Sequence, residues 1–295
     1  MNAETLRACM LGPVIAVAAA VAFPAAPAPA PAPFGLVAAA APRFKAVAFD
    51  YFVLFDPDSV VPEVEAVFPG RGRELTNLWR TRQFEYSWLR SITDRYADFF
   101  AITEDALVYA ANSLKLELTS DHKRRLLDAY LHLTPWPDTV DALRMLKASG
   151  VRIITIANFS PTMLRSNAES AGLLGFFDAL VSTDANRTYK PDPRAYRLGM
   201  DRLRLAKQDI VFAAFGGWDA AGAMSFGYPT FWVNRFNQPF EELGIRPDHT
   251  SPNLGGLLEF VLSKPSAHSK SSGRQPQFAS EPGKSGAEQH ARQHE

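Results

Sequence analysis

Short apolar runs alternate with amphipathic stretches along the second half of this chain. A short apolar run bounded by turn residues is typical of a buried strand, and apolar residues at helical spacing are typical of a helix that packs against a core. The predicted strands are 44–50, 151–157, 179–182, 210–215 and 229–234. The predicted helices between them end at Ala148 or span 163–171, 193–204 and 220–226. This alternation predicts an α/β fold with a Rossmann-like, doubly wound parallel sheet.

The stretch between the first two predicted strands has helical periodicity only. Its predicted helices are 60–68, 73–93, 106–116 and 121–131. The cap-forming residues Thr103 to Asp105 are expected to begin the third of them. A block of helices inside a sheet predicts an inserted α-helical cap domain. The expected division is a catalytic core of residues 44–57 and 136–262 and a cap of residues 58–135.

The two ends of the chain differ in composition from its middle. Residues 8–23 are apolar and rich in Ala and Val, and a Pro/Ala segment follows them. This run is shorter than the roughly 20 residues of a membrane span and fits a secretory signal. We therefore expect residues 1–43 to be a signal peptide and linker, and the protein to be exported to the periplasm without stable membrane association. The alternatives are an uncleaved anchor or a misassigned start codon. Residues 263–295 are polar, and we expect a disordered tail.

The overall composition is that of an ordinary globular protein, with 47% hydrophobic and 21% charged residues. The 31 basic residues balance the 31 acidic ones, which favours no nucleic-acid or membrane-surface partner. The one cysteine, Cys9, lies in the N-terminal segment. The expected folded part therefore has no disulfide and no cysteine-based metal site.

Polar residues follow several of the predicted strands. Asp50 ends the first strand, Asn158 follows the second, Lys190 lies in the loop after the third, and Asp219 follows the fourth. In a parallel sheet, ligands bind at the carboxyl ends of the strands, so we expect these side chains to meet at one edge. A carboxylate there can act as a nucleophile and form an ester that a second step hydrolyses.

Four stretches carry a resemblance to a known family. They are FPGRGRE at 68–74, LWRTRQFEYSWLR at 78–90, YKPD at 189–192 and WDAAGA at 218–223. With these motifs the chain resembles the haloacid dehalogenase superfamily and, within it, the (S)-2-haloacid dehalogenases of type II. The likeness extends over about residues 44–262, and the stretch around Arg80 discriminates this group better than the motifs of the sheet do.

The resemblance implies a two-step hydrolysis of L-2-haloacids to 2-hydroxy acids of inverted configuration. Asp50 would displace the halide from C2 in an SN2 reaction and leave an aspartyl ester. Lys190 would keep Asp50 ionised through its opposite charge. Asp219 would orient or deprotonate the hydrolytic water. The implied partners are a small 2-haloacid and water, and a homodimer is also possible.

The resemblance also assigns residues that bind the substrate. Arg80, reaching in from the cap, and Asn158 would stabilise the departing halide. Phe99 and Trp218 would form apolar walls, and Tyr196 matches a further active-site position. Three of these residues also have a purely structural interpretation. Arg80 could be a charged residue on the surface of a helix, and Trp218 could be part of the core. Tyr196 is as consistent with a structural role as with a catalytic one.

A related hydrolase with another substrate is an alternative, and a phosphatase is the main example. Phosphatases of this fold use a second Asp two residues after the nucleophile and a Mg²⁺ ion held by carboxylates. Here the first position is Phe52, and Phe215 occupies a position where a metal carboxylate would lie. A phosphoryl group needs its charge neutralised, usually by metal. We therefore expect chemistry without a metal or other cofactor.

Several polar groups that the family pattern leads us to expect are absent. The segment after the nucleophile is one residue shorter, with Val53 in place of a hydroxyl residue, and Ala157, Ala214 and Gly216 replace other polar side chains. Their loss motivates another alternative, a non-catalytic protein that binds small acids. The small residues also predict extra room beside the nucleophile for waters or a bulkier substrate.

Overall fold

Five parallel strands form the sheet of this protein, whose computed structural model describes residues 42–263. The predicted signal peptide and linker lie in residues outside this range, apart from 42 and 43, and the predicted tail lies outside it apart from Ser263; both stay predictions. The spatial order is β2-β1-β3-β4-β5. The strands are β1 (Ala46–Phe49), β2 (Arg152–Thr155), β3 (Ile210–Ala214), β4 (Thr230–Val233) and β5 (His249–Ser251). The predicted Rossmann-like α/β core is confirmed.

The chain changes direction across the sheet at β1. Ala48 pairs with Ile154 of β2 on one side and with Phe212 of β3 on the other. The strands that follow β1 in sequence are therefore laid down on both of its sides. In open α/β sheets, such a switch point leaves a crevice at the carboxyl ends of the strands, where ligands bind.

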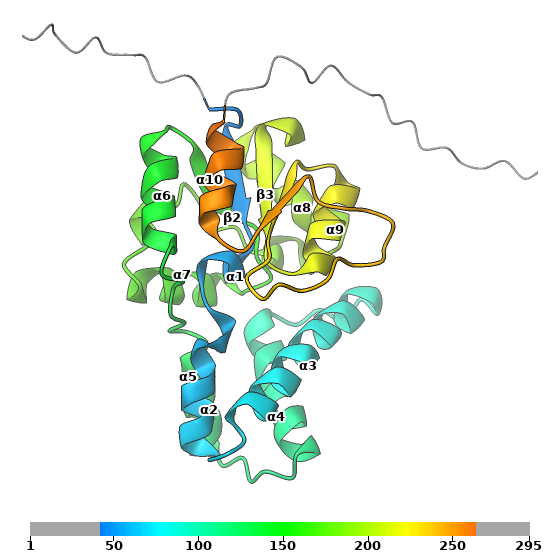
Figure 1. Ribbon diagram of the computed structural model, residues 1–295. Coiled ribbons are helices and arrows are strands. Elements are labelled where there is room, and N and C mark those ends of the chain that lie inside the picture. Colours follow the sequence, from blue (N-terminus) through cyan, green and yellow to red (C-terminus); the bar gives the residue numbers. More distant parts are fainter. Residues whose placement is uncertain (1–41, 264–295) are drawn as a thin grey trace, which may run out of the picture. The chain divides into compact units, whose positions relative to one another are not determined.

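Helices cover both faces of the sheet (Figure 1). They are α6 (Thr139–Ala148), α7 (Pro161–Ser170), α8 (Pro193–Leu203), α9 (Gly217–Phe226) and α10 (Leu254–Leu262). Alternate residues of a strand point to opposite faces. Val47 and Phe49 accordingly share a buried cluster with residues of α6, α7 and α10, whereas Ala46 and Ala48 share one with α8 and α9.

The cap consists of longer helices that lie between β1 and α6 in sequence and form a group of their own in Figure 1. They are α2 (Val61–Val67), α3 (Gly72–Ile92), α4 (Phe99–Ser113) and α5 (Ser120–Ala129). Short helices lie at α1 (Tyr51–Leu54), η1 (Pro57–Val60), η2 (Leu174–Phe176), η3 (Thr183–Asn186) and η4 (Lys207–Asp209). The inserted helical cap is thus present, while its limits at 58 and 135 stay predictions.

Helix α4 begins earlier than its predicted start at Thr103 to Asp105. The side chain of Asp98 accepts hydrogen bonds from the backbone of Phe100 and Ala101 and caps the helix. Thr103 lies inside the helix, where its hydroxyl donates to the carbonyl of Phe99. Asp98 and Thr103 are both cap-forming types, and burial of Phe99 selects the earlier start.

Two further predictions about strands need correction. Residues 179–182 form only isolated parallel bridges, Ile154 with Ala179 and Ala157 with Ser182. The sheet instead gains β5 at its edge, which the sequence did not reveal. His249 and Thr250 are exposed there, so this strand lacks the buried apolar pattern that identifies the others.

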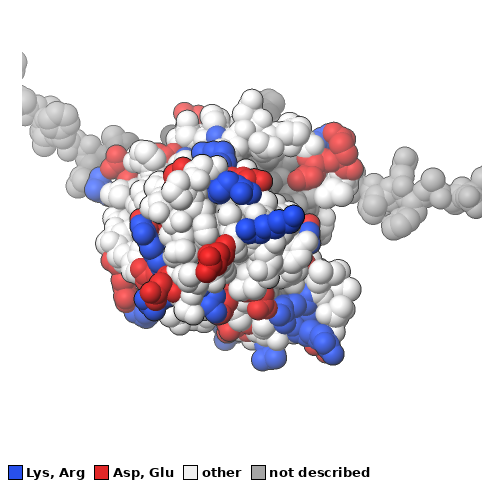
Figure 2. Space-filling view, turned by 90° about the horizontal axis from the view of Figure 1, so that it is seen from below, with Lys and Arg blue, Asp and Glu red and all other residues white. Residues whose placement is uncertain are grey.

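Charges of both signs are interspersed on the face drawn in Figure 2. Many form surface ion pairs within the cap, such as Arg82 with Glu85 and Lys123 with Glu104. Isolated surface pairs contribute little stability, at most about 1 kcal/mol each. Within residues 42–263, no helix has the length and apolar character needed to cross a bilayer.

Candidate active site

Asp50 lies directly after β1 and caps the short helix α1. One carboxylate oxygen, Oδ1, accepts a hydrogen bond from the backbone N–H of Phe52 at 3.0 Å. The other, Oδ2, lies 2.6 Å from Nζ of Lys190. The side chain is 13% exposed, so it is accessible from only a narrow range of directions. These contacts fix the candidate nucleophile in one orientation.

Lys190 joins the two carboxylates of the site. Its Nζ donates to Oδ2 of Asp50 and to Oδ2 of Asp219, each at 2.6 Å, and its side chain is fully buried. Burial by itself would lower the pKa of Lys190, but the two carboxylates outweigh it and the pKa is raised. The ammonium is therefore charged at neutral pH and pairs with both carboxylates.

Asp219 lies in the first turn of α9 and is fully buried. Its Oδ1 accepts a hydrogen bond from the hydroxyl of Tyr196, on α8, at 2.7 Å. Burial raises the pKa of Asp219 to about 6; the charge of Asp50 adds to this rise, while Lys190 and Tyr196 oppose it. Burial also raises the pKa of Tyr196 well above its usual value, so this hydroxyl remains a donor.

Asn158 completes the polar part of the site from the end of β2. Its Oδ1 accepts the backbone N–H of Lys190 at 2.9 Å. Its Nδ2 is buried and has no hydrogen-bond partner among residues 42–263. Because an unpaired buried donor is costly, it marks a place where a bound acceptor would be stabilised.

Two small cavities adjoin Asp50, with volumes of about 10 Å³ and about 80 Å³. Both are lined by Asp50 and by the rings of Phe52, Phe84 and Trp218. The smaller also touches Phe99, Ala157, Asn158 and Phe159, and the larger Phe215, Gly216 and Asp219. The candidate nucleophile thus faces a largely aromatic space bordered by a few polar groups.

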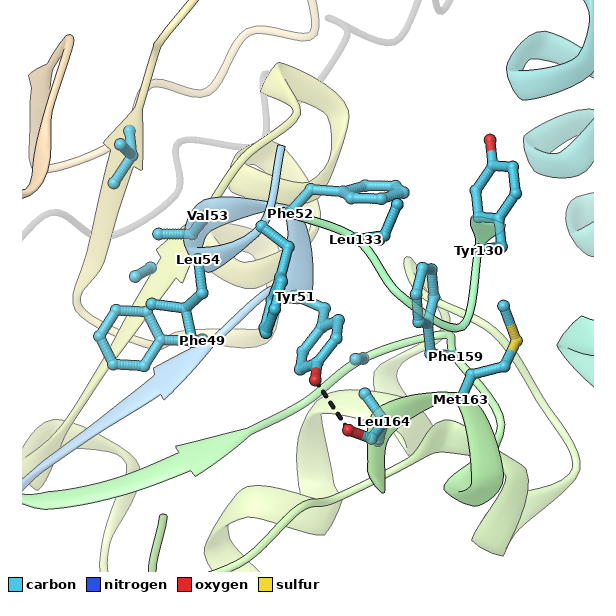
Figure 3. Close-up of a cluster of buried hydrophobic side chains, with 14 of the residues drawn as sticks. Phe49, Tyr51, Phe52, Val53, Leu54, Tyr130, Leu133, Phe159, Met163 and Leu164 are labelled. Atoms are coloured by element: carbon cyan, nitrogen blue, oxygen red, sulfur yellow. Dashed lines mark hydrogen bonds between the residues drawn. The ribbon is translucent and has the colours of Figure 1, made fainter. Parts of the chain in front are cut away.

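The aromatic wall contains residues that the sequence reading missed. Phe84 comes from α3 of the cap, four residues after Arg80, and Phe159 directly follows Asn158. The only feature of the sequence that could have indicated their place in the site is that they lie close to predicted site residues along the chain. Figure 3 shows the buried cluster around Phe159, in which the hydroxyl of Tyr51 donates to the carbonyl of Leu164.

Arg80 lies on α3 but lines neither small cavity. Its guanidinium donates to Oδ1 of Asp58 at 2.5 Å and to the carbonyl of Pro57 at 3.1 Å. Its Nε is buried and has no partner in the described part of the chain. The structure therefore brings Asp50, Asn158, Lys190 and Asp219 together and leaves Arg80 bound to an acidic residue that sequence reasoning did not single out.

The expected extra room beside the nucleophile is wrong at two positions. The indole of Trp218 folds over Gly216, where a Cβ atom would lie only 2.7 Å from its Nε1. Ala214 is fully buried in the sheet core, and so is Val53 in the opposite cluster. Ala157 borders the smaller cavity and Gly216 the larger one. Neighbouring side chains, mostly aromatic, have taken up the volume.

The donor set does not suit a divalent cation. The ammonium of Lys190 already pairs with one oxygen of Asp50 and one of Asp219. Phe52 and Phe215 supply rings where oxygen ligands would be required. Nowhere in residues 42–263 do three or more His, Cys, Asp or Glu side chains gather in a way that could hold a metal.

The fold and the site together define a capped α/β enzyme with a carboxylate as candidate nucleophile. Comparison with known proteins agrees, because the family model for haloacid dehalogenase-like hydrolases matches residues 35–227. The chain is 44% identical over 216 residues to the (S)-2-haloacid dehalogenase of Pseudomonas sp. (strain YL), covering 73% of this chain and 93% of that one. It is 40% identical over 222 residues to the (S)-2-haloacid dehalogenase of Pseudomonas putida, covering 75% and 98%.

A solved structure shows the same likeness. The L-2-haloacid dehalogenase of Xanthobacter autotrophicus with chloropropionic acid covalently bound is 35% identical, with a TM-score of 0.69 over 72% of this chain and 96% of that one. This protein belongs to the haloacid dehalogenase-like hydrolases, in the group of the (S)-2-haloacid dehalogenases. The resemblance inferred from the sequence motifs is confirmed.

Proposed function

We propose that this protein hydrolyses (S)-2-haloacids to 2-hydroxy acids of inverted configuration, with Asp50 as nucleophile. The observation that carries the proposal is the Asp50–Lys190–Asp219 cluster at the carboxyl end of the sheet. It supplies an ionised nucleophile, a fixed positive charge and a second carboxylate in one place. The (S)-2-haloacid dehalogenases with 40–44% identity to this chain support the same substrate class.

In the first step, an oxygen of Asp50 attacks C2 and forms a C–O bond while the carbon–halogen bond breaks. The halide leaves with the bonding electrons, and the acid becomes esterified to Asp50. Lys190 donates to Oδ2 of the nucleophile at 2.6 Å and holds this oxygen in place during the attack. The unpaired Nδ2 of Asn158 is suited to donate to the halide or to the substrate carboxylate.

In the second step, water attacks the ester carbonyl carbon of Asp50, and the bond from this carbon to the ester oxygen breaks. The departing alkoxide takes one proton of the water and leaves as the 2-hydroxy acid. Asp219 takes the other proton of this water, and the carboxylate of Asp50 is restored. The cavity of about 80 Å³ borders both carboxylates and is large enough for water. Because attack falls on the carbonyl carbon, the inversion at C2 from the first step is retained.

Arg80 remains a proposed halide ligand that needs a change of partner. Asp58 holds its guanidinium, and an incoming halide would have to compete with this carboxylate. Loss of the Asp58 contact on binding is therefore part of the proposal. Arg73 also pairs with Asp58, so the carboxylate keeps a cation when Arg80 leaves.

The test is release of chloride from (S)-2-chloropropionate and from its (R) enantiomer by purified protein with EDTA present. We expect release from the (S) acid only, with (R)-lactate as product. Turnover that requires Mg²⁺ and acts on phosphate esters would establish the phosphatase alternative instead. Tight binding of the (S) acid without chloride release would establish the non-catalytic alternative.

The hydrolysis step should lose rate with falling pH, because protonated Asp219 cannot accept a proton from water. The pKa of Asp219 is about 6 while Asp50 is charged, and esterification removes that charge, so the loss should set in below about pH 6. In single-turnover experiments below this pH, mass spectrometry should detect accumulated ester on Asp50. Asp219→Asn should slow this step by about 10²- to 10⁴-fold at every pH. It should also remove the fall in rate at acid pH, which we call the acid limb of the pH–rate profile.

Tyr196→Phe provides a matched control for this pH dependence. It removes the hydroxyl that lowers the pKa of Asp219 and keeps the ring. The acid limb should therefore move to higher pH in this variant. An unchanged limb in both the Asp219 and Tyr196 variants would assign the titration to another group.

We further propose that the protein is exported to the periplasm and forms a homodimer. The apolar run at residues 8–23 supports export, and the exposed Leu89 on α3 supports a contact between copies. Cell fractionation with sequencing of the mature N-terminus tests the first proposal. Sedimentation equilibrium tests the second, and a monomer at micromolar concentration would refute it.

A further inference from the structure

A larger groove lies beside the active site, on the outer side of Trp218. Its volume is about 910 Å³, within the usual range for small-molecule sites. The end of α3, the segment 189–193, helix α9 and residues 243 and 245 line it. Its surface is mostly apolar, with contributions from Ile92, Pro191 and Leu243. We call it the outer groove.

Trp218 is the one side chain that lines the outer groove and both small cavities. Its ring packs edge-on against Phe84 and Trp88 of the cap, at centroid distances of 5.4 and 5.5 Å. On its other side it lies over Gly216, which has no Cβ to displace it. The indole of Trp218 therefore borders the outer groove as well as the cavities beside the candidate nucleophile.

The small cavities hold little more than the reacting atoms. A space of about 10 Å³ accommodates about one water, and one of about 80 Å³ accommodates a few. A 2-haloacid must place its C2 beside Asp50, so any chain beyond the first carbons needs another space. The outer groove is the adjoining volume of sufficient size, reached past Trp218.

The chemistry of the outer groove selects the kind of chain. Among residues 42–263 no basic side chain lines it, and the one charged residue there, Asp192, is already paired with Arg194. A second carboxylate on the substrate would find no partner there. Ile92 and Leu243 are 82% and 64% exposed, so an alkyl chain would cover apolar surface that water now reaches.

We propose that the outer groove is a subsite for the apolar tail of longer (S)-2-haloalkanoic acids, with Trp218 as the side chain that the tail passes. This inference rests on the proposed dehalogenase function and extends it to a substrate class. It makes chain length, rather than the halogen alone, a determinant of specificity.

The test compares kcat/KM for chloride release from (S)-2-chloropropionate, (S)-2-chlorohexanoate and (S)-2-chlorooctanoate, below their micelle concentrations. A buried methylene favours binding by about fourfold, and partial burial by less. We expect kcat/KM to rise at least about tenfold from the shortest to the longest acid. A chlorinated dicarboxylic acid of similar length should show no such gain.

Two variants locate the effect. Ser225→Trp places a large ring in the groove from an exposed position of α9, and Leu243→Glu places a charge there. Each should remove most of the gain for the long acid and leave 2-chloropropionate unchanged. Ser170→Trp is the matched control, since Ser170 is an exposed serine on α7 whose hydroxyl also bonds a helix carbonyl. It should change neither substrate.

The possible failures are distinguishable. Turnover of 2-chloropropionate with kcat/KM falling as the chain lengthens would overturn the tail subsite and leave the proposed function standing. Absence of chloride release from every acid by the folded protein would overturn both. Dissociation of an oligomer by Ser225→Trp, with no change in chain-length preference, would assign the groove to a second copy of the chain and overturn the inference.

Discussion

Replacing Asp50 with Asn should reduce chloride release from (S)-2-chloropropionate by on the order of 10⁴- to 10⁶-fold, as loss of a covalent nucleophile does elsewhere. The amide cannot form the ester, because its oxygen is a poor nucleophile. The fold should persist, since Asn is as good a helix cap as Asp and can still accept the N–H of Phe52. The measurement is the initial rate of halide release, with circular dichroism to confirm folding.

An exposed aspartate serves as control for this substitution. Asp201→Asn, on α8, changes the same functional group far from the cluster and should leave the rate unchanged. Wild-type enzyme in H₂¹⁸O gives an independent readout. During the first turnover, the heavy oxygen should enter the carboxylate of Asp50 and not the hydroxy acid. Label in the first-turnover product would mean direct attack by water and would refute the ester mechanism.

Replacing Lys190 with Met should give the second largest effect, because it removes the shared partner of two carboxylates. Breaking a buried ion pair on one side typically costs about 3–5 kcal/mol of unfolding free energy. Halide release should also fall by about 10²- to 10³-fold, as when a preorganised electrostatic donor is lost. Urea denaturation and the rate assay measure the two effects.

The stability loss in Lys190→Met should depend on pH with a defined sign. Without the ammonium, the folded-state pKa of buried Asp219 rises still further above its unfolded value. A group with a raised folded pKa loses stabilisation as the pH rises through that value. The deficit against wild type should therefore be larger at pH 8 than at pH 5. A deficit that grows toward acid would contradict this account.

Two variants complete the Lys190 experiment. Lys190→Met combined with Asp219→Asn should recover part of the lost stability, because it removes the unpaired buried charge. Lys45→Met is the exposed counterpart, since Lys45 pairs with Asp209 at 3.0 Å and its side chain is 63% exposed. It should cost at most about 1 kcal/mol. Equal losses at positions 45 and 190 would show that burial does not govern the effect.

Much of the core and site followed from local sequence pattern. The run that ends at Asp50 predicted a buried strand with a carboxylate at its end, and β1 has this form. Asn158, Lys190 and Asp219 meet Asp50 because parallel strands bring their carboxyl ends to one edge. The alternation of strands and helices is encoded in local periodicity and requires no knowledge of distant contacts. The α/β fold class could therefore be predicted from the sequence.

Other features depended on competition between distant groups. Helix α4 begins at Phe99, after Asp98, rather than at the equally suitable Thr103, because burial of Phe99 favours the longer helix. Arg80 pairs with Asp58, 22 residues away, and a sequence does not reveal which of several acids an arginine will meet. The exposed edge strand β5 carries no apolar alternation and takes its form from pairing with β4.

The sequence by itself determined the α/β core, the helical insertion and the identity of the four polar residues at the sheet edge. These follow from periodicity and from the geometry that all parallel sheets share. Only the tertiary structure decided how the space around Asp50 is filled. The indole of Trp218 occupies the volume over Gly216 and borders both the small cavities and the outer groove. Close packing lets any neighbouring side chain take up a vacated volume, and which one does so is settled in three dimensions.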